Sequence, residues 1–200
     1  MAAVAKIRFM KVGAMVSKKF TVNAMPIKGK GHTRYAFYAL IMALGLASCT
    51  PALNWRAVSV GGLATWLPCK PDRAQRPLEM GGKTIQMEMA GCEAQGVMYA
   101  VSHARVPEAS ESDAVAVAWQ NASLKQMQAG APQHTVFQTR GENQIQGRFF
   151  KATGARSNGQ VLQAQLVWVV QGDEIYHLAT YAATLTAEQT DPFFSEVKIQ

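Results

Sequence analysis

A short uncharged stretch near the N-terminus decides where the folded part of this chain begins. Residues 35–46 read YAFYALIMALGL and contain no charged side chain. A helix that crosses a bilayer needs about 20 apolar residues, so this run is too short for a comfortable membrane span. Lys28, Lys30 and Arg34 precede it, and a positive flank before an apolar core is typical of a secretory signal. We therefore leave residues 1–48 out of the fold prediction.

Small residues and a cysteine follow the apolar run directly. Leu46-Ala47-Ser48-Cys49 resembles the lipobox of bacterial lipoproteins, a family in which the cysteine sulfur receives a diacylglycerol and the leader is cut before it. The resemblance implies a mature protein that is exported and anchored through lipid on Cys49, facing the periplasm. Thr50, in place of an aspartate, resembles the sorting pattern for the outer membrane. An ordinary signal peptide or an uncleaved anchor is the alternative interpretation.

The first 24 residues exceed what a signal of ordinary length requires. A start at Met25 would leave a leader over residues 25–48, within the usual range of about 15–30 residues. We hypothesise that translation starts at Met25 and not at Met1.

The formal net charge of +7 belongs to the leader. Residues 1–48 hold eight Lys and Arg and no acidic residue, which leaves twelve basic against thirteen acidic side chains in residues 49–200. A protein that binds nucleic acid needs clustered positive side chains to neutralise phosphates. We therefore expect no nucleic-acid partner.

Two cysteines remain once Cys49 carries lipid. Because an exported chain folds where disulfides form, we predict a bond between Cys69 and Cys92. Closing a loop of that size stabilises the fold by roughly 3 kcal/mol in the chain-entropy model. Two unlinked buried thiols are the alternative.

Hydrophobic periodicity after the tether at 49–62 predicts a single domain over residues 63–200. Residues 84–89 alternate without a fault, with Ile85, Met87 and Met89 on the inward face. Ser110 and Asp113 have capping-box spacing and predict a helix to about Gln128. Residues 55–58 are a candidate first strand, and residues 63–67 are a second strand or its continuation. Further strands are expected, in chain order, at 84–89, 97–101, 135–140, 148–152, 162–170 and 174–183.

Turn signals and helical spacing complete the prediction. The prolines between 68 and 77 predict an exposed loop, and 91–96 predict another between two hairpin strands. Helical spacing places Val115, Ala118, Trp119 and Ala122 on one stripe of the long helix. Thr186 and Asp191-Pro192 both signal starts for a final helix whose Phe193, Phe194 and Val197 pack on the sheet. Consecutive hairpins with segregated helices predict an α+β fold around an antiparallel sheet of about six strands.

This order of elements, closed by Asp191-Pro192-Phe193-Phe194-Ser195, resembles the PsbP-like α/β/α sandwich over most of residues 55–198. The resemblance implies one long helix between hairpins and a short terminal helix. It implies no catalytic residue, and many members of that superfamily are assembly or accessory proteins.

Candidate reactive side chains do not combine into a catalytic or metal-binding pattern. Histidines 103, 134 and 177 lie far apart, no CxxC pair exists, and no serine sits in a nucleophile elbow. We interpret His177 as a core residue and see no nucleophile near His103. The remaining candidates read as core filler or solvated side chains: Met80, Met87, Met89 and Met98 for a soft metal, and Glu88 with Glu93 as a carboxylate pair.

The sequence thus predicts a non-catalytic envelope lipoprotein that supports an unidentified protein partner, without catalytic residues, metal or cofactor. A small-molecule or lipid binder is the second class and an enzyme the third. A deep apolar pocket would favour the binder, and a histidine with a positioned carboxylate in such a pocket would favour the enzyme. A flat apolar patch would favour the interaction protein.

Overall fold

The computed structural model describes residues 53–80, 82–140 and 144–200, so Cys49 and the leader lie outside the described residues. The described residues form an α+β fold with ten strands in two sheets and two α-helices. The strands are β1 (Arg56–Val60), β2 (Leu63–Leu67), β3 (Asp72–Met80), β4 (Lys83–Ala94), β5 (Val97–Arg105), β6 (Gln133–Gln138), β7 (Gln146–Ala155), β8 (Val161–Gln171), β9 (Glu174–Ala182) and β10 (Lys198–Ile199). The helices are α2 (Ser112–Gln126) and α3 (Ala187–Ser195), and a 3-10 turn, η1 (Ala109–Glu111), precedes α2.

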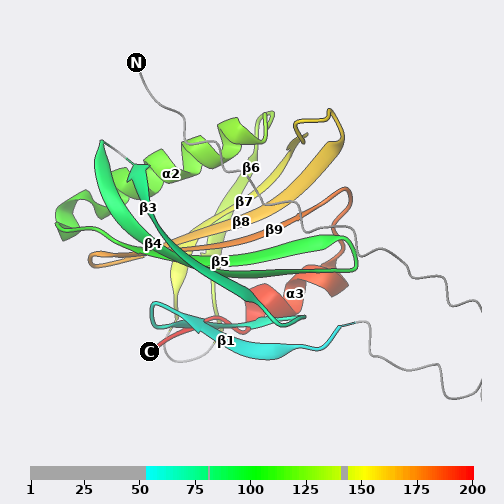
Figure 1. The fold of residues 1–200 in the computed structure, drawn as a ribbon, viewed down its shortest axis with the longest axis horizontal. Coiled ribbons are helices and arrows are strands. Elements are labelled where there is room, and N and C mark those ends of the chain that lie inside the picture. The colour runs from blue at the N-terminus through cyan, green and yellow to red at the C-terminus, as the bar shows by residue number, and fades with distance from the viewer. Residues whose placement is uncertain (1–52, 81, 141–143) are drawn as a thin grey trace, which may run out of the picture. The chain divides into compact units, whose positions relative to one another are not determined.

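A seven-stranded antiparallel sheet forms the middle layer, in the order β3-β4-β5-β9-β8-β7-β6. Helix α2 covers one side, which we call the helix face, and the three-stranded sheet β1-β2-β10 with α3 covers the other, which we call the hairpin face (Figure 1). The prediction of about six strands was therefore too low, because it missed β3 in the large sheet and did not foresee the small sheet as a separate layer. The first hairpin also starts at Arg56, inside the segment 49–62 predicted as tether.

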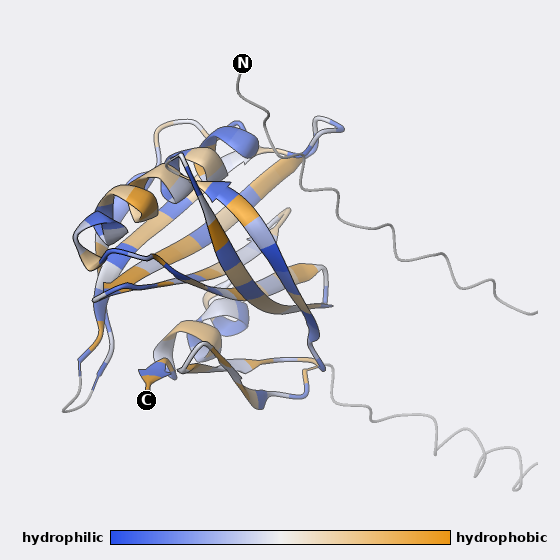
Figure 2. Ribbon diagram, turned by 60° about the vertical axis from the view of Figure 1, so that its left-hand side comes forward, coloured by the Kyte–Doolittle hydropathy of each residue, from blue (hydrophilic) through white to orange (hydrophobic). Residues whose placement is uncertain are grey.

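The central strands are buried on both sides, so the domain has two cores. In β8, Leu166 and Trp168 point into the core under α2, while Val167 and Val169 point into the core under the hairpin. Figure 2 shows orange, hydrophobic residues along the strands of the large sheet. A strand covered on both faces needs no polar alternation. Periodicity predicts one inward set here, Leu162, Ala164, Leu166, Trp168 and Val170, and this is incomplete because Val167 and Val169 are buried on the opposite face.

Strand β4 is longer than its sequence pattern predicts. Met87 packs in the core of the helix face, and Ala90 and Cys92 pack in the core of the hairpin face. Each half of the strand is thus covered on a different side, which hides the continuation of the strand from a period-2 search. The predicted loop at 91–96 is wrong, since only Gln95 and Gly96, both with positive φ, form the turn.

The proline-rich segment predicted as a loop at 68–77 mostly forms β3, which is also a correction. β3 is an edge strand paired only with β4 among the described residues, and Pro77 lies opposite Gln86. An edge strand tolerates a residue without an N–H, so proline does not exclude a strand here.

Helix α2 begins later than predicted and is covered on one stripe. Its N-cap is Glu111, without a side-chain capping bond, because the turn η1 includes Ser110 and shifts the helix start. The predicted capping box is therefore wrong. Val115 and Trp119 are buried as predicted, whereas Ala122 is exposed.

Helix α3 begins at the first of its two predicted start signals, and the second, Asp191-Pro192, is wrong because both residues lie inside the helix. Thr186 and Gln189 form the capping box at its start, and Pro192 lies inside the helix. Phe193 and Val197 are buried in the core of the hairpin face. The helix is thereby held between the small sheet and the large one.

Candidate functional site

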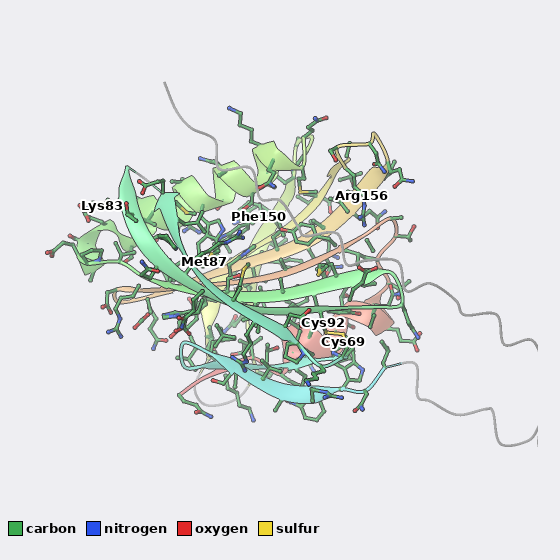
Figure 3. All side chains as sticks on the ribbon, in the orientation of Figure 1. Cys69, Lys83, Met87, Cys92, Phe150 and Arg156 are labelled. Carbon is green, nitrogen blue, oxygen red and sulfur yellow. A yellow bond between two sulfur atoms is a disulfide. The ribbon has the colours of Figure 1, made fainter. Side chains whose placement is uncertain are left out.

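The structure joins Cys69 to Cys92 by a disulfide, the pairing that the cysteine count predicts, with Cα atoms 6.0 Å apart (Figure 3). Cys92 lies on β4 in the core of the hairpin face, and Cys69 follows β2. The bond therefore ties the first hairpin to the central sheet. Cys49, the predicted lipidation residue, lies outside the described residues.

The largest cluster of charged side chains lies where β5 meets β9. Glu174 accepts hydrogen bonds from Arg105 and pairs with the imidazole Nε2 of His103, and Arg105 also lies 3.4 Å from Asp173. Burial alone would raise the pKa of Glu174, but the hydrogen bonds from Arg105 and His103 and their charges lower it below its usual value. The His103 ring stacks on Tyr176, with centroids 5.1 Å apart. We call these five side chains the charged cluster.

The turn of the first hairpin covers this cluster. Gly61 sits directly on the His103 ring, where a Cβ atom would overlap the imidazole. The Tyr176 hydroxyl donates a hydrogen bond of 2.8 Å to the Gly61 carbonyl. Two shallow hollows on the surface flank helix α3, and neither His103 nor Glu174 lines either of them. His103 and its positioned carboxylate therefore lie beneath the hairpin turn that Tyr176 holds.

His177 is a core residue, as predicted. It stacks on Trp168 with ring centroids 4.3 Å apart, and Trp119 of α2 lies 5.1 Å away on a tilted ring. Burial lowers its pKa to about 3, because a charged imidazole has no solvent there. Its Nε2 atom has no hydrogen-bond partner among the described residues. A neutral imidazole between two indoles serves packing.

The other candidates stay apart or serve packing. The described residues contain no group of three His, Cys, Asp or Glu side chains that could hold a metal ion. Met80 and Met87 belong to the core of the helix face, and Figure 3 shows Met87 within the fold. Glu88 accepts a hydrogen bond from Gln75 across the β3–β4 pair.

Two shallow hollows flank helix α3, and both lack the features of an enclosed ligand pocket. The first, the α3 groove, has a volume of about 420 Å³ and runs between α3 and the β6–β8 end of the sheet. Its lining residues are Val136, Phe137, Gln138, Phe149, Lys151, Gln165, Leu185, Ala187, Thr190, Asp191 and Phe194. The second, the tryptophan notch, has a volume of about 490 Å³ and is lined by Trp55, Trp66, Asp191, Pro192, Ser195 and Glu196.

The α3 groove borders one open edge of the large sheet, strand β6, and the two edges differ. Strand β3, at the other edge, carries Pro77 and four charged side chains, the usual protection against pairing with a further strand. Strand β6 reads QHTVFQ, without proline, Lys, Arg, Asp or Glu, and its Val136 side chain is 72% exposed. Sequence analysis missed this site, although the uncharged segment 133–138 was the available signal.

No known protein family matches this sequence, and no curated protein is significantly similar to it. Within the described residues, no helix combines the length and apolar character needed to cross a membrane.

Proposed function

We propose that this chain is an exported lipoprotein whose domain binds a partner protein, without catalysis, at strand β6 and the adjoining α3 groove. The observation that carries the docking site is the unprotected edge of β6 beside an aromatic groove. An extended segment of the partner adds to such an edge through main-chain hydrogen bonds, and alternate side chains enter the neighbouring groove. Phe149 and Phe194 supply apolar contact there, while Lys151 and Asp191 supply polar contact at the rim.

The disulfide supports the export part of this proposal. Bonds of this kind persist in oxidising compartments and are rare in the cytosol. The lipobox-like segment ending at Cys49 supplies the anchor, with the outer membrane as the proposed site.

We also propose that the fold is of the PsbP-like sandwich type. An initial hairpin, one long helix, a meander and a Phe-containing terminal helix follow each other in the order expected for it. The accessory roles common in that superfamily agree with a binding domain.

A photo-crosslinking residue at position 136 tests the docking site in intact cells. We expect a discrete covalent adduct with one partner protein. The matched control is position 161, the other strongly exposed valine of a strand, 57% exposed at the start of β8. Equal adducts at both positions, or none at 136, would contradict the docking site. Labelling with a fatty acid in wild type and Cys49→Ser tests the anchor separately, and label that persists in the variant contradicts it.

A further inference from the structure

Apart from Asp191, which also lines the α3 groove, the residues of the tryptophan notch have no part in the proposed docking function. Trp66 is 43% exposed. The other exposed large apolar side chains among the described residues are all valines, so Trp66 stands out as aromatic. Trp55 packs edge-on against Tyr99, with centroids 6.0 Å apart, which holds its ring in place. Pro192 of α3 forms part of the wall. The notch is therefore a rigid aromatic hollow and not a loose surface patch.

The charged side chains of the notch indicate which sign of charge a bound group should carry. Asp191 and Glu196 line it, no basic side chain does, and neither carboxylate has an ion-pair partner among the described residues. The face of an indole attracts cations, and two carboxylates add to that attraction. An ammonium group beside an apolar body fits both features, whereas an isolated anion would be repelled.

The position of the notch in the chain limits where it lies relative to a lipid on Cys49. Trp55 follows Cys49 by six residues, and a fully extended chain of that length spans at most roughly 21 Å. An acylated Cys49 therefore keeps Trp55 within about that distance of the bilayer surface. Tryptophan side chains favour the headgroup region, because their rings are apolar and their N–H is polar.

We propose that the tryptophan notch rests on the membrane that holds the lipid anchor and receives the ammonium of a zwitterionic headgroup of the ethanolamine or choline type. This inference rests on the lipoprotein part of the proposed function. An acyl chain alone leaves the domain free to rotate, and contact through the notch fixes one orientation. Strand β6 is then presented at a constant angle to the membrane.

The test uses full-length protein with acylation at Cys49 checked by mass spectrometry, in phosphatidylethanolamine and phosphatidylcholine vesicles brominated near the headgroup. Of the described tryptophans, Trp119 and Trp168 are buried, so bromine quenching of fluorescence reports Trp55 and Trp66. We expect quenching in wild type and also in Trp55→Phe, which leaves Trp66 as the reporting indole of the notch. The matched control is Val161→Trp in a Trp55→Phe, Trp66→Phe background, whose indole should stay unquenched. An unquenched Trp66, or equal quenching at 161, overturns the proposal.

A second arm separates this proposal from the anchor itself. Cys49→Ala protein carries no lipid, and we expect it to bind the same zwitterionic vesicles weakly through the notch. Asp191→Asn with Glu196→Gln should weaken that binding by about threefold, because the ammonium loses both carboxylates. Binding unchanged by the double substitution, or stronger on phosphatidylglycerol vesicles, overturns the notch proposal even where Cys49 is acylated. A wild-type protein without acyl mass at Cys49 contradicts the anchor alone.

Discussion

The two faces of the central sheet are held by different kinds of interaction. On the hairpin face, a disulfide and long-range hydrogen bonds attach the small sheet to the large one, including a bond of 2.8 Å from the Tyr176 hydroxyl to the Gly61 carbonyl. On the helix face, α2 is held by packing around Trp119, Trp168 and His177. A hairpin of two five-residue strands is marginally stable alone, so it needs specific ties to the large sheet in addition to its buried apolar side chains. Helix α2, which has 15 residues and buries the indole of Trp119, does not need such ties.

The largest expected effect is on the tie between the hairpin turn and the charged cluster. Gly61→Ala places a Cβ atom on the His103 ring and an alanine at φ +56°. Overpacking and the left-handed backbone together should cost about 4 kcal/mol of the free energy of unfolding. Urea denaturation measures this loss in the free energy of unfolding.

Gly172→Ala is the matched control, because Gly172 has φ +62° and no neighbouring atom within 4 Å of the position that a Cβ atom would take. It should cost about 1 kcal/mol from the backbone alone. Equal losses at the two glycines would show that the turn does not press on His103.

The disulfide is the next largest contribution to the hairpin face. Cys69→Ala with Cys92→Ala should lower the free energy of unfolding by about 3 kcal/mol, since the bond closes a loop with a sequence separation of 23. Reduced wild-type protein should lose a similar amount, which separates the bond from the packing of the sulfurs. A reductant that leaves the unfolding midpoint unchanged would contradict this tie.

The helix face should be the acid-sensitive one between pH 6.5 and 5. His177 has its pKa lowered to about 3, so it stays neutral in the folded state while an unfolded histidine binds a proton below about pH 6.5. Its contribution is fully present above pH 6.5 and falls with pH, by about 2 kcal/mol at pH 5. His177→Leu should flatten the stability profile over this range. Glu174, with its lowered pKa, loses its contribution only at lower pH, near the ordinary range of a carboxyl.

The smallest expected effect comes from one hydrogen bond on the hairpin face. Tyr176→Phe removes the hydroxyl that donates to the Gly61 carbonyl and should cost about 1 kcal/mol. Amide hydrogen exchange should rise in residues 58–65 and stay unchanged in α2. A rise that includes α2 would show that the two faces unfold as one unit.

Local signals predicted those parts of the fold that depend on neighbouring residues. The alternation of Ile85, Met87 and Met89, and the apolar face of α3, can be read from short windows. Strand β3 could not, because an edge strand half in solvent has no apolar period. The charged cluster could not either, since His103 and Glu174 are separated by 71 residues and meet only through the β5–β9 pairing.

The sequence by itself determined a hairpin between the strands at 84–89 and 97–101, the start of the terminal helix at Thr186 and the two cysteines available for a bond, because turn, capping and counting rules act over a few residues or on composition. Only the tertiary structure decided which strands are covered twice, that Gly61 closes over His103, and that strand β6 is left as an open edge beside a groove. Burial on a sheet face depends on what packs across it, and that layer comes from segments as distant as residues 56–67 and 187–199.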